Sequence, residues 1–207
     1  MKLVFISDTH TKHRDLIIPD GDAVIFSGDL STRGYIDEVK EFLDWLSELP
    51  HKHKIFIAGN HDFLFDNHKN IAKELIPDNV HYLEDSGIIL DGIHFYGSPV
   101  TPYFHNWAFN RTSAKIIPHW DAIPEGVDVL ITHGPPENIL DKVVRGGANV
   151  GCPHLLEAVE RIKPAIHVFG HIHEAYGVMK VNGTTFINAS VLNERYLLVN
   201  EPVVFEI

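Results

Sequence analysis

Short apolar runs rich in valine, isoleucine and phenylalanine recur along the chain, and such runs are typical of buried β-strands. The five clearest cover residues 3–6, 23–26, 54–57, 127–131 and 165–169. Further strand candidates cover 87–90, 93–96, 177–181, 184–188 and 203–207. Between two of these, Asn182-Gly183 suits a type I′ turn and predicts a hairpin.

Helical periodicity is clearest over 36–49, where apolar residues recur at steps of three and four before Pro50. A second helix is expected over 153–162, because proline opens it and Pro164 follows its end, and a weaker third over 67–76. Strands that alternate with helices, followed by a strand-dense second half, predict a mixed α/β layered sandwich. No repeat or linker interrupts the 207 residues, so we expect one domain spanning 1–207.

The net charge and the cysteine count exclude or disfavour several classes of protein. The 28 acidic residues outnumber the 17 lysines and arginines, for a formal net charge of -11, which disfavours polymeric nucleic acid or an anionic membrane as a partner. The single cysteine, Cys152, excludes an internal disulfide and thiolate zinc motifs. Because the amino terminus also lacks a signal-peptide pattern, we expect a cytoplasmic protein.

Side chains with metal-binding chemistry follow each of the five clearest strands. In chain order the segments are Ser7-Asp8-Thr9-His10, Ser27-Gly28-Asp29, Ala58-Gly59-Asn60-His61-Asp62, Thr132-His133-Gly134 and Gly170-His171-Ile172-His173. Ligands of α/β sheets bind outside the carboxyl ends of the strands, so we expect these side chains to converge.

The converging donors are carboxylate oxygens and imidazole nitrogens without sulfur, a set that suits manganese, iron, zinc, cobalt or magnesium. So many ligands exceed the needs of one tetrahedral ion but suit two ions that share a carboxylate. Taken singly, each of these segments has an ordinary structural explanation. Gly28-Asp29 is a common turn, and His133 could be a core histidine whose hydrogen bonds are satisfied. Their occurrence in this order, each at a strand end, favours a metal site.

These segments match the signature of the calcineurin-like metallophosphoesterases. Beyond the signature, nearly the whole chain resembles the metallophosphoesterase-domain-containing subgroup, known from animal brain proteins. The shared phrases are IAGNHD at 57–62, GSPVTP at 97–102, THGPP at 132–136, HVFGHIHEAYG at 167–177 and INAS at 187–190. The resemblance implies an α/β fold, a four-layer metallophosphoesterase sandwich of two mixed β-sheets flanked by helices.

The resemblance also implies a role for each polar residue. One metal would be held by Asp8, His10 and His173, a second by Asn60, His133 and His171, with Asp29 as the bridge. His61 would contact the scissile phosphate and donate a proton to the leaving group, and Asn60 is expected to contact the substrate as well as the metal. A brain member of the subgroup has glycine in place of His171, so the histidine here implies a complete second site and a more active enzyme.

The expected chemistry uses two divalent cations, with manganese the first choice. Such a pair can bind a bridging water, lower its pKa to form a hydroxide nucleophile, and offset charge on the phosphate oxygens. His61 is the candidate general acid, a role worth about a hundred- to ten-thousand-fold in rate. Asp62 is expected to assist by orienting the His61 ring, with a surface carboxylate or a local cap as the alternative.

Substrate contacts are less sharply indicated. Arg14 follows the first ligand motif and could contact phosphate, or it could lie in a solvated loop. Trp107 and Phe109 could form an aromatic wall for a nucleobase, or belong to the core. Asn149, in the glycine-rich loop 145–149, could belong to a phosphate cradle or a lid.

The favoured function is a metal-dependent phosphoesterase, in particular a phosphodiesterase, that acts on small substrates such as nucleotides or cyclic nucleotides. One alternative is a scaffold of the same fold that binds metal or nucleotide with little catalysis, and the complete ligand set argues against it. The other is a nuclease on polymeric nucleic acid, which the acidic balance disfavours. A homodimer is compatible with the sequence.

Overall fold

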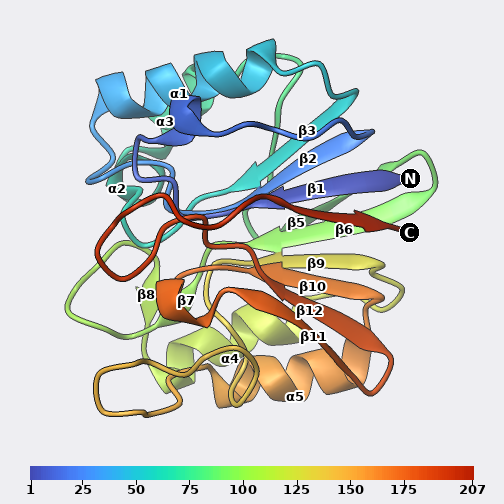
Figure 1. The fold of residues 1–207 in the computed structure, drawn as a ribbon. Helices are drawn as coiled ribbons and strands as arrows, with labels where there is room; N and C mark the ends of the chain where they lie inside the picture. Colours follow the sequence, from blue (N-terminus) through green and yellow to red (C-terminus); the bar gives the residue numbers. More distant parts are fainter.

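Three of the predicted strands form the centre of the first sheet. They are β1 (Lys2–Ile6), β2 (Ala23–Ser27) and β3 (His53–Ile57), all parallel, with β13 (Val203–Glu206) and β4 (His81–Tyr82) at the edges. The computed structural model describes all 207 residues. Helices α1 (Ile36–Glu48), α2 (Phe63–Asn67) and α3 (Lys69–Glu74) lie on the outer side of this sheet (Figure 1).

The second sheet faces the first and is mixed. Its order is β11 (Gly177–Val181), β12 (Thr184–Asn188), β10 (Ile166–Phe169), β9 (Val129–Thr132), β6 (Ile93–Ser98) and β5 (Ser86–Leu90). Helices α4 (Ser113–Asp121) and α5 (Pro153–Ile162) cover its outer face, and two short strands, β7 (Thr101–Pro102) and β8 (Asn110–Arg111), pair apart from both sheets. The four-layer sandwich expected from the sequence is confirmed.

Alternation along the strands divides the apolar residues between separate cores. Leu3 and Phe5 of β1 point between the two sheets, into a cluster completed by strand residues such as Ile25, Val129 and Ile187. Val4 and Ile6 point the other way, into the core under α1. A third cluster lies between the second sheet and α4 and α5. The central strands of each sheet are covered on both faces. Their sequences are therefore continuous apolar runs rather than alternating patterns.

The helices differ from the sequence analysis at two places. Helix α4 was not predicted, because Pro118 lies inside it and proline is unfavourable within a helix, yet Ile116 and Trp120 are buried in the core beside α5. The single helix expected over 67–76 is instead two short helices, α2 and α3, that meet at His68. None of the helices combines the length and apolar character needed to cross a membrane.

The β11–β12 hairpin has the turn that its residues predict. Asn182 and Gly183 both have positive φ, 50° and 93°, as a type I′ turn requires. The strands pair antiparallel up to this turn, with Val181 opposite Thr184. This prediction is confirmed.

One histidine of the core is distant from any charge partner. His167 on β10 is fully buried between Phe169 and Phe186, with ring centroids 5.1 and 5.7 Å away. The Thr132 hydroxyl donates to the Gly134 carbonyl (2.8 Å), so His167 Nε2–H donates to the Thr132 oxygen (2.8 Å). Its Nδ1 has no partner, and burial lowers the pKa of His167 to about 3.

We predict that His167 makes the protein less stable in mild acid. The unfolded chain binds a proton on this ring below about pH 6.5, whereas the folded protein does not until about pH 3, so stability rises with pH across this window and is lost as pH falls. The contribution is at most about 1.4 kcal/mol per pH unit. Urea unfolding of wild type and His167→Gln between pH 7 and 4.5 should show a shallower pH slope for the variant.

The control for this experiment is His68→Gln, since the His68 ring is exposed. Its pH slope should match that of wild type. Parallel slopes for wild type and His167→Gln would contradict the account.

Candidate metal centre and substrate cavity

The carboxyl ends of parallel strands from both sheets meet at one edge of the sandwich, and backbone hydrogen bonds join them there. Ser7, directly after β1, donates its N–H to Ala189 O (2.9 Å) and accepts from the N–H of Val191 (3.1 Å), just beyond β12. Within the second sheet, Gly170 N–H donates to His133 O (2.9 Å). The loops after the five predicted strands therefore converge on one place.

Two carboxylates lie at this junction. Asp8 is fully buried and accepts hydrogen bonds from Ser190 Oγ (2.8 Å) and the His171 N–H (3.0 Å). Asp29 is 2% exposed and accepts from the His61 N–H (2.8 Å). Both adopt left-handed backbone angles, with φ of 56° and 58°, which aspartate tolerates better than most residues. Buried carboxylates require compensating positive charge.

Four imidazoles are held in a common orientation around these carboxylates. Each Nδ1 is hydrogen-bonded to a backbone carbonyl: His10 to Ser31 (3.1 Å), His61 to Thr32 (2.8 Å), His133 to Ser27 (2.9 Å) and His173 to Asn193 (3.0 Å). Because a carbonyl oxygen only accepts, each Nδ1 carries a proton, and Nε2 is the ring nitrogen that faces the carboxylates and is open to a ligand once it is unprotonated. Metal-binding histidines are commonly fixed in this way.

Asp29 occupies the centre of the group. Its Oδ2 lies 3.3 Å from His133 Nε2, 3.7 Å from His10 Nε2 and 3.9 Å from His61 Nε2. On the far side, Asp8 Oδ1 lies 3.4 Å from His173 Nε2. One carboxylate thus faces imidazoles that come from the ends of three different strands.

The candidate ligand atoms fall into overlapping groups, each with atoms within 4.8 Å of one another. The groups are Asp8, His10 and His173; Asp29, His133 and His171; and His10, Asp29 and His61. Asn60 Oδ1 lies 2.9 Å from His133 Nε2, which places the amide beside the second group. The structure therefore brings together all seven residues predicted as ligands, together with His61.

Each carboxylate has an imidazole as its electrostatic partner. Burial opposes charge on His133, but the adjacent Asp29 raises the pKa of His133 to about 9. Burial likewise opposes charge on His173, and the hydrogen bond with Asp8 raises its pKa to about 9. Burial alone would raise the pKa of Asp8 and Asp29, yet these imidazoles hold both below the ordinary range. Both carboxylates are ionised at neutral pH, the form that binds cations.

The arrangement fits divalent cations. His10 Nε2 is buried and has no hydrogen-bond partner, which is unusual for a buried polar atom unless a ligand uses it. Burial and the nearby His133 lower the pKa of His171 to about 4, so this ring is neutral, as a ligand must be. A Cβ at Gly170 would overlap the Asp8 carboxylate, so glycine is needed for this close approach.

Asp62 does not orient the His61 ring, and this prediction is corrected. The His61 Nδ1–H donates to the Thr32 carbonyl instead. The buried Asp62 carboxylate accepts five hydrogen bonds, from the N–H groups of Gly59 (2.7 Å), Asp29 (3.0 Å), Leu30 (3.3 Å) and Ser31 (3.0 Å) and from Ser31 Oγ (2.6 Å). Asp62 thereby ties the loop after β2 to the loop after β3.

Asp62 is ionised at neutral pH despite its burial. Burial and the nearby Asp29 raise the pKa of Asp62 to about 6, and the hydrogen bonds from Ser31 and Gly59 oppose this rise. A carboxylate that only accepts is suited to five converging donors. Its role in the structure is therefore to position Asp29 and Asn60.

The cluster opens into a cavity of about 650 Å³, whose lining includes the aromatic residues Tyr103, Phe104, Trp107 and Tyr196. Trp107 belongs to this wall and stacks on His61, with ring centroids 4.3 Å apart and 27° between the planes. The Arg33 guanidinium lies 4.9 Å from the centroid of the Trp107 ring. Phe109, proposed from the sequence as a second wall residue, is 1% exposed and belongs to the outer core of the first sheet, so that interpretation is corrected.

Two residues predicted to contact substrate do not line the cavity. Arg14 pairs with Glu41 and, at 3.6 Å, with Glu48, both on α1. The Asn149 side chain donates to that of Asn138. These two predictions are corrected, since each side chain is engaged elsewhere.

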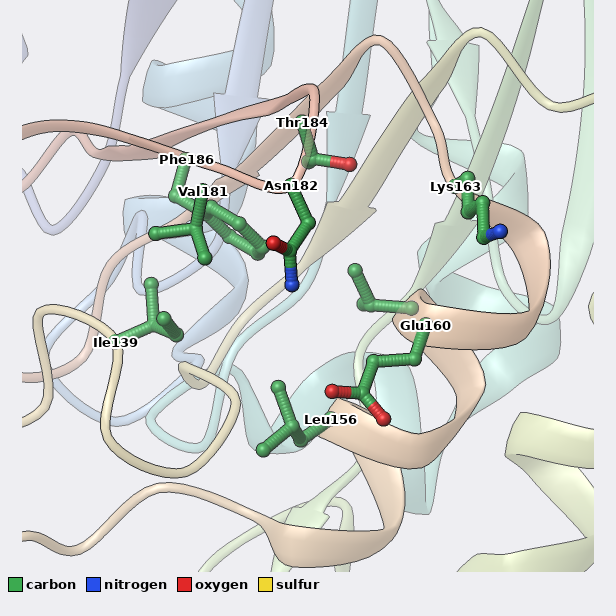
Figure 2. Close-up of a pocket in the computed structure, with 9 residues that line it drawn as sticks. Ile139, Leu156, Glu160, Lys163, Val181, Asn182, Thr184 and Phe186 are labelled. Carbon is green, nitrogen blue, oxygen red and sulfur yellow. The ribbon is translucent and has the colours of Figure 1, made fainter.

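A smaller hollow of about 310 Å³ lies between α5 and the β11–β12 hairpin (Figure 2). Apolar side chains that include Leu156 and Phe186 line it, and Glu160 and Lys163 on α5 contribute the charged groups. None of its lining residues belongs to the strand-end cluster, so this hollow is separate from the candidate centre.

Several residues that build the site carried no recognisable signal. Ser31 and Asn193 contribute carbonyls to histidines, and a carbonyl is present at every position of a chain. Ser190 lies in the shared phrase INAS, but the phrase does not reveal that its hydroxyl reaches Asp8. Tyr196 lines the cavity from a segment that shows no motif.

Comparison with known proteins identifies the family. The model described as calcineurin-like phosphoesterase matches residues 1–175, which include every member of the cluster. The chain belongs to the calcineurin-like phosphoesterase family. This membership, with the candidate ligand groups, assigns the chain to the metal-dependent phosphoester hydrolases.

Relatives extend the similarity over the full chain. Human metallophosphoesterase domain-containing protein 1 is 41% identical over 232 residues, which cover 100% of this chain and 71% of the human protein. A UPF0046 protein from Caenorhabditis elegans is 39% identical and covers 100% of this chain and 75% of its own length. The resemblance to the metallophosphoesterase-domain-containing subgroup is confirmed.

Solved structures of low identity share the fold. Phosphopantetheinyl hydrolase from Mycobacterium tuberculosis aligns with a TM-score of 0.68 at 17% identity, over 94% of this chain and 90% of that protein. TT1561 of Thermus thermophilus aligns with a TM-score of 0.64 at 12% identity, over 90% and 88%. These likenesses support the sandwich architecture alone.

We predict that Asp62→Ala is strongly destabilising, because it leaves buried donors of two loops without an acceptor. Each unsatisfied buried donor costs roughly 1–3 kcal/mol before relaxation, so we expect the free energy of unfolding to fall by about 3 kcal/mol or more in urea titrations. Asp62→Asn, which keeps one acceptor oxygen, should lie between. Asp121→Ala, exposed on α4, is the control and should change stability by less than about 0.5 kcal/mol. A loss under about 1 kcal/mol for Asp62→Ala would contradict this role.

Proposed function

We propose that this protein hydrolyses phosphodiesters, with two divalent cations held by the strand-end cluster. The observation that carries the proposal is that Asp29 lies between two groups of candidate ligands. In the proposed assignment, Asp8, His10 and His173 hold one cation, Asn60, His133 and His171 hold the other, and Asp29 bridges them. When bound, such a pair lowers the pKa of a water molecule and offsets the charge of the phosphate.

The protein's own contribution begins with orientation. The carbonyl partners of His10, His133 and His173 keep their Nε2 atoms directed at the carboxylates. Burial of Asp8 and Asp29 keeps water from competing for them and strengthens their interaction with any cation. The set of oxygen and nitrogen donors supports manganese as the first choice, with iron, zinc, cobalt and magnesium as alternatives.

His61 is the proposed general acid. Its Nδ1–H is bound to the Thr32 carbonyl, so the proton available for a leaving group is on Nε2, on the side of Asp29. Stacking on Trp107 restricts rotation of the ring. A fixed ring can deliver a proton to the departing oxygen without prior reorganisation.

The cavity supports a small substrate with a flat or apolar group. Its volume of about 650 Å³ lies within the range usual for small-molecule sites, and Tyr103, Phe104 and Trp107 contribute aromatic surface. Nucleotides and cyclic nucleotides are the substrates proposed on this basis, since bases stack on aromatic side chains. A cytoplasmic location is part of the proposal and rests on the lone, buried Cys152.

Removal and return of metal tests the proposal. After treatment with a chelator, hydrolysis of bis-p-nitrophenyl phosphate should cease, and Mn²⁺ should restore it. Activity on p-nitrophenyl phosphate, a monoester with the same leaving group, should be lower. Failure to hydrolyse the diester with manganese, iron, zinc, cobalt or magnesium would favour a scaffold without catalysis.

The variant His61→Ala tests the general acid. Manganese binding, measured by isothermal titration calorimetry, should stay close to that of wild type. Turnover should fall by about a hundred- to ten-thousand-fold for a diester with an alkoxide leaving group, and by less for p-nitrophenolate, which needs no proton. The control is His68→Ala on the surface. An equal loss for both leaving groups would remove His61 from proton transfer.

A further inference from the structure

A short loop beyond the family match brings a tyrosine to the metal cluster. The family model ends at residue 175, whereas this loop covers 192–198. Leu192 and Leu198 form an isolated β-bridge at its base, and Asn193 N–H donates to Leu197 O (2.9 Å). The loop carries Tyr196, which lines the cavity with His10 and His173 beneath it.

Asn193 couples the shape of this loop to the metal cluster. Its side-chain Oδ1 accepts from the N–H groups of Arg195 (2.9 Å) and Leu197 (3.0 Å). Its carbonyl accepts from the Tyr196 N–H (2.8 Å) and also from His173 Nδ1 (3.0 Å). One residue therefore sets both the orientation of a candidate ligand and the position of Tyr196.

The Tyr196 ring is placed edge-on to two candidate ligands. Its centroid lies 5.0 Å from that of His10 at 67° and 5.2 Å from that of His173 at 71°. Its backbone has a φ of 57°, an uncommon conformation for a bulky residue. The carbonyl of Tyr196 also accepts a hydrogen bond from Lys12 Nζ. Contacts on both sides of the loop thus maintain a strained backbone that directs this ring toward the cluster.

The hydroxyl of Tyr196 is free to meet a ligand. It makes no hydrogen bond within the protein, whereas the hydroxyl of Tyr103, in the same cavity, donates to Asn106 (2.7 Å), and that of Tyr176 donates to the Glu201 carbonyl (2.9 Å). A tyrosine hydroxyl carries a proton that it can donate to a hydrogen bond. It is therefore a hydrogen-bond donor on the wall of the cavity into which the candidate ligands open.

We propose that Tyr196 is a further catalytic residue, whose hydroxyl donates a hydrogen bond to a phosphoryl oxygen of the substrate on the Asp8, His10 and His173 side of the cluster. This inference rests on the proposed function. The hydroxyl complements charge on the phosphate without changing its own protonation. A neutral donor also avoids repulsion from the nearby cations, which a lysine or arginine at this place would suffer.

A purely structural role for Tyr196 makes a different prediction. If the ring only packs against His10 and His173, removing the hydroxyl while keeping the ring has no effect. Tyr196→Phe therefore separates the two roles, and Tyr196→Ala removes both. Tyr35→Phe, on a side chain that is 64% exposed and outside the cavity, is the matched control.

Three measurements on the manganese-loaded protein test the proposal. For Tyr196→Phe, we expect unchanged binding of Mn²⁺, about tenfold lower kcat/KM for bis-p-nitrophenyl phosphate, and about three- to tenfold weaker binding of inorganic phosphate by calorimetry. Tyr196→Ala should lose at least as much on phosphate and should also bind Mn²⁺ more weakly. Tyr35→Phe should match wild type throughout.

The outcomes distinguish this inference from the proposed function. If wild type binds Mn²⁺ and phosphate but hydrolyses no diester, the proposed function fails, and the phosphate affinities of wild type and Tyr196→Phe still decide the role of the hydroxyl. If wild type is active and Tyr196→Phe equals it in turnover and phosphate affinity, the inference alone is overturned. Phosphate binding that is absent in both proteins overturns it as well.

Discussion

The burial of two carboxylates at the junction of two sheets is the constraint on which the rest of the site depends. Asp8 and Asp29 are almost wholly removed from water, and ionised groups in such a place require positive charge close by. The rings of His133 and His173 supply part of it without metal. When a cation takes the place of the Nε2 proton, the imidazoles and the carboxylates form donor groups suited to it. The same negative charge that would destabilise an empty core therefore becomes the source of affinity for metal.

Hydrogen bonds around the cluster hold its side chains in fixed positions. Backbone carbonyls from two segments fix the imidazoles, three from residues 27–32 at the end of β2 and one from Asn193. The Asp62 carboxylate joins the loops that carry Asp29 and Asn60. Left-handed backbone angles at Asp8, Asp29 and His171 show that the local conformation is strained, and such strain persists only where surrounding contacts determine it. Preorganisation of this kind lets a site act on charge that develops in a transition state without first rearranging.

The sequence predicted the fold and the residues of the cluster, but not most of the contacts around the cluster. Apolar runs that each end in Asp, Asn or His predicted which residues converge, because a strand end fixes where the next side chains lie. Helix α4 was missed since Pro118 interrupts its pattern, and the Asp62–His61 contact was wrong because adjacency in sequence does not determine where two side chains point. Arg14 does not contact the cavity because its side chain pairs with acidic residues on α1. No local motif reveals this pairing. Tyr196 reaches the site only through the fold of a loop, and a loop of that kind carries no periodic signal.

The central claim, that two cations lie on either side of the Asp29 carboxylate, is tested most directly by anomalous X-ray diffraction from crystals grown with manganese. Two anomalous peaks should appear per chain, one beside Asp8, His10 and His173 and the other beside Asn60, His133 and His171, with Asp29 in contact with both. A single peak remote from Asp29, or no peak under saturating manganese, would contradict the account.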